Sequence, residues 1–288
     1  HRAESEELWN IPQGTLNPKV GYDLMKMLRG LEDGSLNFLW TQVVNIFQST
    51  PNNTHWIQAA RKPENFVVVS DVYPTFSGAC ADLILPAAMH FEKWGFYGNG
   101  ERRTQGWQQM VKPTGDSRTD VWMMMEFSKH FTVDECWGPQ HVAGVEGDTL
   151  PDVRTTAHAM GISGNATLFD VLFAPSEKRQ AVWPDPLYKN GLNTTGEALG
   201  LPYLPEKALW NEYRQFTLGH GHDLADFDTY MRDDVHGLLW PVVNGKETLW
   251  RYNTDTDPYA KADNLFYGPL MKSIPSGNLA GVTDAEAK

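Results

Sequence analysis

The spacing of apolar residues changes repeatedly along the first half of the chain. Helical spacing is found at 22–31, 54–62 and 119–131, and short apolar runs typical of strands at 36–45 and 66–70. The run at 66–70, FVVVS, is apolar at four consecutive positions, as in parallel strands that are covered on both faces. A short helix and a further strand are expected over 77–88. This alternation predicts an α/β fold with a parallel sheet.

Three local features refine this prediction. Thr54 stands at the start of the second helix, where a threonine side chain suits the N-cap. Residues 94–105 are rich in glycine and are expected to form a loop. The run MMMEF at 123–127 is expected to pack in the core.

The pattern fades after about residue 140, where Gly, Pro, Asn and Asp become more frequent. Beyond this point only 167–173 and 206–216 show helical spacing. We therefore expect an irregular, loop-rich second half that packs against other parts of a larger molecule. The chain starts without an initiator Met and ends on a polar stretch, so we expect it to be an internal piece of a longer protein.

Charge and cysteine content narrow the range of partners. The 24 Lys and Arg against 36 Asp and Glu give a net charge of −12, which argues against a nucleic-acid or anionic-membrane surface. No apolar run approaches the ~20 residues of a spanning helix. The two cysteines, Cys80 and Cys136, lie far apart without metal-ligand spacing, so two buried thiols are expected, although a disulfide stays open.

Polar residues follow the two predicted strands, at Asn45 and at Ser70–Asp71. Ligands of open parallel sheets bind beyond the carboxyl ends of the strands, where an acid accepts hydrogen bonds from ribose hydroxyls. The glycine fingerprint of nicotinamide dinucleotide sites is absent after the first strand, which argues against a simple NAD site. The pattern alone leaves two interpretations of Asp71: it binds a ligand, or, as is more common, it caps the next helix.

Two further motifs carry weaker chemical signals. The GNGERR stretch at 98–103 offers backbone N–H groups and two arginines to a phosphate. The stretch GHGHDLADFD contains His220 and His222 beside acids, a combination that can bind zinc. No remote ligands accompany the two histidines, so a structural role is favoured for them.

A long stretch of the chain resembles the molybdopterin-dependent oxidoreductases. It contains SDVYPT, ADLILPAAM, YGNGERRTQ and TDVWMMMEFSKHF, and the likeness continues in GHGHDLADFDTY and LLWPVVNGKETLWRYN. Within these enzymes the chain is most similar to the catalytic subunits of periplasmic nitrate reductases, from about residue 8 to 267. The chain departs from that pattern at Trp94, which replaces a carboxylate, and at Gly106.

The resemblance implies a definite function for the parent protein. Such enzymes reduce nitrate to nitrite at a molybdenum atom held by two molybdopterin guanine dinucleotides, and a [4Fe–4S] cluster receives electrons from a dihaem cytochrome in the periplasm. By motif match, five residues fall on positions that bind one dinucleotide: Asn45, Ser70, Asp71, Lys93 and Asp120. Asp71 suits ribose or guanine donors, Lys93 the pyrophosphate and Asp120 guanine, whereas Asp82 is expected to be structural.

The resemblance also sets the expected organisation of the chain. Residues 1–145 would form part of an αβα, Rossmann-like molybdopterin guanine dinucleotide-binding domain, and 146–288 an irregular segment against other domains. No catalytic residue and no metal ligand is expected here, because neither Cys80 nor Cys136 has the context of the molybdenum-ligating cysteine, and the cluster cysteines are missing. The alternatives are another molybdopterin enzyme, such as a formate dehydrogenase or an assimilatory nitrate reductase, and a non-catalytic segment that docks a cytochrome.

Overall fold

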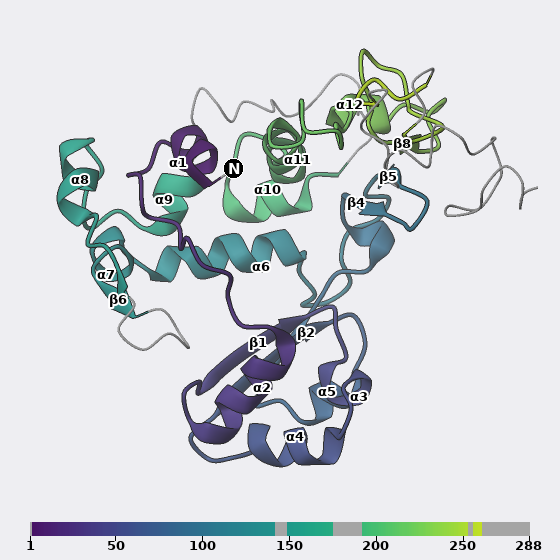
Figure 1. The fold of residues 1–288 in the computed structure, drawn as a ribbon. Helices are drawn as coiled ribbons and strands as arrows, with labels where there is room; N and C mark the ends of the chain where they lie inside the picture. Colours follow the sequence, from purple (N-terminus) through teal and green to yellow (C-terminus); the bar gives the residue numbers. More distant parts are fainter. Residues whose placement is uncertain (1, 142–148, 175–191, 253–255, 261–288) are drawn as a thin grey trace, which may run out of the picture. The chain divides into compact units, whose positions relative to one another are not determined.

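The computed structural model describes residues 2–141, 149–174, 192–252 and 256–260 (Figure 1). Contacts divide the chain into two compact units. The first consists of His1–Trp94 and Gln108–Ala208, and the second of Gly95–Trp107 and the described residues from Leu209 onward. Each unit is described separately below. The domain boundary expected near residue 145 stays a prediction.

A three-stranded parallel sheet forms the centre of the first unit, which confirms the mixed α/β class. Its strands lie in the order β1 (Phe38–Gln42), β2 (Phe66–Asp71) and β3 (Leu83–Pro86). The helix α2 (Leu24–Asp33) precedes β1, α3 (Ile46–Ser49) and α4 (Asn53–Ala60) connect β1 to β2, and α5 (Phe76–Ala79) connects β2 to β3. Gln42 is paired with Ser70, and Asp71 with Pro86, so all three strands end along one edge.

Both faces of this sheet are covered, as the apolar run of β2 predicted. Val67 and Val69 pack into a core that includes Leu28 and Leu31 of α2. The other face carries Trp40, whose ring meets Phe127 of α6 (Asp120–Phe127) edge-on at 5.2 Å between centroids. Coverage from both sides is the reason that consecutive residues of β2 are buried.

Helices make up most of the rest of the first unit. It contains α1 (Arg2–Trp9), α7 (Val133–Cys136), α8 (Arg154–Ala159), α9 (Leu168–Leu172) and α10 (Thr194–Leu199), with the single turns η1 (His90–Glu92) and η2 (Ser128–His130). A two-residue ladder joins β6 (Gln140–His141) to β7 (Thr149–Leu150). Of the methionine run, Met123 and Met125 are buried as expected, whereas Met124 is about half exposed.

The second unit has an antiparallel sheet in the order β4 (Gly95–Gly98), β5 (Arg103–Trp107) and β8 (Leu238–Leu239). The expected loop at 94–105 is therefore wrong: most of it is the β4–β5 hairpin. Glycine is required at position 95, because a Cβ atom there would lie 2.1 Å from the Trp107 ring. The ring of Phe96 stacks on Trp210 with centroids 3.5 Å apart. Trp210 belongs to α11 (Pro205–Gln215), and α12 (Phe227–Tyr230) packs nearby.

Two helix predictions also need correction. The N-cap of α4 is Asn52, in the left-handed region with φ 56°, and Thr54 lies inside the helix. Asparagine tolerates this conformation, so the chain turns into the helix two residues earlier than the threonine indicated. In the second half, α8, α10 and α12 accompany the two expected helices. They have six, six and four residues, too few to produce a visible helical period.

Candidate cofactor site

Four segments of the chain lie side by side at the carboxyl edge of the parallel sheet: β1, β2, the extension of β3 and the segment at Arg118. β2 lies between β1 and β3, and beyond Pro86 the chain continues the pattern, since Ala87 pairs in parallel with Arg118. The N–H of Ala88 donates to the carbonyl of Arg118 at 2.8 Å. Asn45, Asp71 and Asp120 follow or end these segments, so backbone pairing alone brings their positions to one edge.

Asp71 ends β2 and does not cap the following helix. Its Oδ1 accepts from the backbone N–H groups of Val72 and Tyr73, at 2.7 and 3.3 Å. The cap of α5 is Thr75, whose hydroxyl accepts from Gly78 at 3.2 Å. Asp71 is half-buried, and its Oδ2 has no hydrogen-bond partner within the described ranges. The more common interpretation of the motif, a helix cap, is therefore wrong here.

Ser70 and Asn45 hold the edge together from within. The Ser70 hydroxyl is fully buried and accepts from the indole Nε1 of Trp40 at 2.7 Å, so it points into the sheet. The Asn45 Oδ1 accepts from the backbone and hydroxyl of Ser77 at 3.0 and 2.6 Å. Its Nδ2 donates to Gln48 at 2.5 Å. Asn45 thus ties the exit of β1 to the first turn of α5.

Lys93 and Asp120 form an ion pair at the start of α6. Their side chains retain 18% and 26% of their exposure, and Lys93 Nζ contacts Asp120 Oδ2. Asp120 is the first residue of the helix, whose N-cap Thr119 accepts from Trp122 at 3.1 Å. Asp120 Oδ1 is buried without a hydrogen-bond partner in the described part of the chain. An acceptor without a donor in such a place is costly unless a ligand supplies the donor.

A buried carboxyl group supports the same helix start. The hydroxyls of Thr119 and Thr195 lie 2.7 Å apart, and Thr195 donates to Glu206 Oε1. All three side chains are buried, and Glu206 Oε2 has no partner among the residues described. Burial raises the pKa of Glu206 to about 6. Sequence reasoning missed this group, because an acid in the first turn of a helix is usually an exposed feature.

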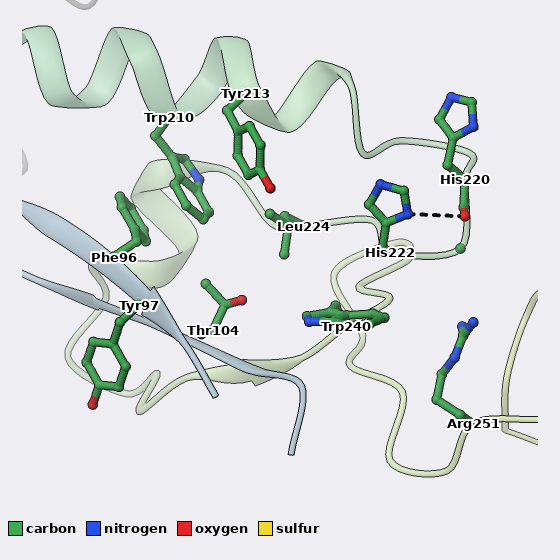
Figure 2. A pocket seen from close by; sticks show the side chains of 12 residues that line it. Phe96, Tyr97, Thr104, Trp210, Tyr213, His220, His222, Leu224, Trp240 and Arg251 are labelled. Atoms are coloured by element: carbon green, nitrogen blue, oxygen red, sulfur yellow. Dashed lines mark hydrogen bonds between the residues drawn. The ribbon is translucent and has the colours of Figure 1, made fainter. Parts of the chain in front are cut away.

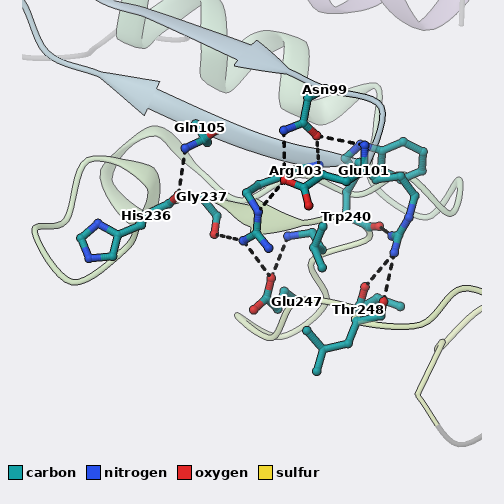
Figure 3. A network of polar contacts seen from close by, with 12 residues as sticks. Asn99, Glu101, Arg103, Gln105, His236, Gly237, Trp240, Glu247 and Thr248 are labelled. Carbon is teal, nitrogen blue, oxygen red and sulfur yellow. Dashed lines mark hydrogen bonds and ion pairs between the residues drawn. The ribbon is translucent and has the colours of Figure 1, made fainter.

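The arginines of GNGERR are engaged within the second unit (Figure 3). Arg102 donates to the backbone carbonyls of Trp240, Thr248 and Leu249, the last two at 3.2 and 3.3 Å. Arg103 donates to the carbonyl of Gly237 at 3.1 Å and to Glu101 at 3.2 Å. These contacts join the hairpin to the segment around β8. They occupy the arginine donors on which a phosphate-binding role of the GNGERR stretch would depend.

The remaining candidates form no metal site in the part of the chain that the structure describes. No group of three His, Cys, Asp or Glu side chains there is placed to hold an ion. His222 Nδ1 lies 3.2 Å from the carbonyl of His220. Cys80 and Cys136 form no disulfide in the described structure, and burial raises the pKa of each thiol.

The sequence model of the molybdopterin oxidoreductases matches residues 9–130. The chain is also 48% identical, over 304 aligned positions, to the periplasmic nitrate reductase of Campylobacter fetus subsp. fetus (strain 82-40). That alignment covers 99% of this chain and 32% of the relative, so the chain spans about a third of the curated relative's length.

All five residues assigned by motif lie inside the stretch that matches the molybdopterin oxidoreductases. The family implies a molybdenum–pterin cofactor, and the geometry of the carboxyl edge fits a nucleotide portion of such a group. Asp120 and Asp71 each keep a carboxylate oxygen without a donor among the described residues, and guanine and ribose present N–H and O–H donors.

Within the described ranges, no helix has the length and apolar character to cross a membrane.

Proposed function

We propose that this chain is part of a periplasmic molybdenum enzyme that reduces nitrate to nitrite, and that its first unit binds one guanine dinucleotide of a bis-molybdopterin guanine dinucleotide cofactor. The observation that carries the proposal is the Oδ1 of Asp120, which is buried beside Lys93 at the carboxyl edge of a parallel sheet and has no hydrogen-bond partner among the described residues. When bound, the molybdenum centre supplies oxygen-atom transfer from nitrate, a two-electron reduction.

Each side chain at the edge has a separate task in this proposal. Asp120 Oδ1 accepts from guanine N–H groups, while its Oδ2 stays with Lys93. Lys93 has three N–H donors and uses one on Asp120, so two remain for a phosphate oxygen. Asp71 offers Oδ2 to a ribose or guanine donor, because Val72 and Tyr73 fix its other oxygen.

Asn45 and Ser70 would contact the ligand through an amide N–H and through the main chain. Asn45 keeps one N–H of its amide for the ligand after the contact with Gln48, and Ser77 fixes the orientation of that amide. The Ser70 hydroxyl is engaged with Trp40, so a contact from Ser70 to the cofactor comes from its main chain. The ligand would thus meet a rigid edge whose supporting hydrogen bonds already exist without it.

The proposal extends to the electron route of the whole protein. A [4Fe–4S] cluster with ligands outside this chain receives electrons from a dihaem cytochrome, and the periplasm is the compartment. The compartment is supported by the similarity to the Campylobacter enzyme, whose name states its compartment and its substrate. The cluster and the cytochrome are what the resemblance of the sequence to periplasmic nitrate reductases implies. A formate dehydrogenase or an assimilatory nitrate reductase would use the same dinucleotide site with a different substrate or compartment.

Molybdenum content of the full-length protein tests the site. We expect Asp120→Asn and Asp71→Asn to lower the molybdenum and the releasable guanine nucleotide per protein, because an amide nitrogen opposes the donors of guanine and ribose. Asp116→Asn is the matched control: it makes the same change at an exposed residue four positions before Asp120. Normal cofactor loading in both site variants would refute the assignment.

Substrate assays then separate the nitrate enzyme from its alternatives. The loaded wild-type protein should oxidise reduced viologen with nitrate and should not reduce a dye with formate. If the protein reduces the dye with formate, and Asp120→Asn still lowers the molybdenum content as predicted, the cofactor site is supported and the nitrate assignment is rejected.

A further inference from the structure

The second unit contains a cavity of about 530 Å³ that the proposed cofactor site does not use. It lies beside the β4–β5 hairpin and is bordered by α11 and the loops that follow it (Figure 2). Its walls are mainly aromatic, with side chains from Phe96, Tyr97, Trp210, Tyr213 and Trp240. Volume and lining both match the usual properties of small-molecule sites, which are largely apolar with a few placed polar groups.

Among the described residues that line the cavity, Arg251 is the permanently charged one and none is an acid. Its side chain retains 17% of its exposure, and Nη1 donates to Asp257 Oδ1 at 3.2 Å. The other N–H groups of Arg251 have no hydrogen-bond partner among the residues that the structure describes. A largely buried guanidinium with unused donors is suited to a planar anion, which it binds through two parallel hydrogen bonds.

The charges around Trp240 are unbalanced. The guanidinium of Arg251 lies 6.0 Å from the centre of the Trp240 ring, and that of Arg102 lies 5.6 Å from it. Burial, and then the charge of Arg251, lower the pKa of Arg102. Asp257 is the one carboxylate that contacts Arg251 in the described ranges, so the two guanidiniums and this acid leave a net charge of about +1.

Both carboxylate oxygens of Asp257 already accept hydrogen bonds, so this acid offers no further acceptor to Arg251. It is 1% exposed, its Oδ1 also accepts from Tyr259 at 2.9 Å, and its Oδ2 accepts from Tyr252 at 2.9 Å. The buried acid therefore fixes the position of Arg251 and leaves the charge imbalance to be met from the cavity. An anion in the cavity would neutralise the charge that remains on Arg102, Arg251 and Asp257 taken together.

The polar and aromatic groups stand at different ends of the cavity. Figure 2 shows Arg251 at one end, with His220 and His222 on the same side, and the Phe96–Trp210 stack at the other end. Trp240 lies between them. A ligand that satisfies both ends therefore has a flat apolar body and a single acidic group.

We propose that this cavity is a binding site for a planar aromatic molecule that carries one carboxylate. The carboxylate pairs with the free donors of Arg251, and the ring lies along Trp240 toward Phe96 and Trp210. The site shares no residue with the carboxyl edge of the parallel sheet, and the proposal does not depend on the cofactor assignment.

Calorimetric titration of the full-length protein with 2-naphthoate tests the proposal, and 2-naphthamide serves as the uncharged analogue. We expect saturable binding of one naphthoate per chain, roughly tenfold to a hundredfold tighter than the amide, the range of charge-assisted hydrogen bonds. Arg251→Gln should weaken naphthoate to the level of the amide. Arg232→Gln makes the same change at an exposed arginine, whose side chain is 60% exposed, and should leave binding unchanged.

A second variant avoids Arg251, whose loss leaves Asp257 unpaired. Gly98 lines the cavity two residues after Phe96, on the same face of β4, and a Cβ atom there would meet only Arg103 O at 4.0 Å. Gly98→Leu should block naphthoate and naphthamide alike, whereas Gly100→Leu, with open space around it, should not. Equal affinity for acid and amide, undiminished binding to Gly98→Leu, or no saturable binding would each overturn the proposal.

Discussion

Glu206 is expected to make the stability of the first unit fall as the pH rises. Its carboxyl group is buried, accepts from Thr195, and has an Oε2 with no partner among the described residues. Burial favours the uncharged form and raises the pKa from 4.5 to about 6. We consider Glu206→Gln, in which the amide oxygen still accepts from Thr195 and the charge is gone.

The size of the effect follows from the two pKa values. The difference between 4.5 and about 6 is worth about 2 kcal/mol at about 1.36 kcal/mol for each pH unit. The folded state holds the proton more tightly, so this stabilisation is complete below pH 4.5. It declines as the pH passes through the folded pKa and is lost above it. The glutamine variant has no such decline.

Urea unfolding of this chain, followed by tryptophan fluorescence at pH 4.5 and pH 7.5, measures the difference. The change in unfolding free energy on Glu206→Gln should be more favourable at pH 7.5 by about 2 kcal/mol, whatever the constant cost of the buried amide. Glu197→Gln, at an exposed acid of α10, should show no such change with pH. The same effect of Glu206→Gln at both pH values would refute the reasoning.

Two other substitutions test the supports of the sheet. Val43 has φ 62°, where a β-branched residue is strained by about 1–2 kcal/mol, so Val43→Gly should raise the midpoint of urea unfolding. Val44→Gly, at a residue without positive φ, should lower it, and a decrease for both would contradict the strain. Asp82→Ala leaves the N–H of Val67 without its acceptor and should lower the unfolding free energy by about 1–3 kcal/mol. Asp116→Ala, at an exposed acid, should leave the midpoint nearly unchanged, and equal losses would count against the role of Asp82.

The sequence was informative where structure depends on neighbouring residues. The run FVVVS predicted a doubly covered strand, and Val67, Val68 and Val69 are indeed 0%, 4% and 1% exposed. The ends of these strands can be placed for the same reason, so the sequence alone predicts that Asn45 and Asp71 lie at one edge. The motif of the family added Lys93 and Asp120, whose ion pair joins positions 27 residues apart.

Contacts between distant residues could not be predicted in this way. Thr119 meets Thr195 across 76 positions, and no local pattern connects the start of α6 to Glu206. The direction of the Ser70 side chain was also hidden, because an apolar run covered on both faces gives no alternation to read. The hairpin at 95–107 was obscured by its glycines, although Gly95 is needed for the close approach of Trp107.

Three aspartates of the first unit show why residue type alone does not identify a site. Asp82 precedes β3, where its oxygens accept from Val67 at 2.8 Å and from Arg61 at 2.5 Å, so it is satisfied at the amino end of the sheet. The hydrogen bond from the backbone N–H of Val67 is the main cause of the lowered pKa of Asp82. Asp71 and Asp120 lie at the carboxyl end, and each keeps one oxygen without a donor within the described ranges. Because ligands of parallel sheets bind at that end, the unused acceptors, rather than the acids themselves, mark where a nucleotide would bind.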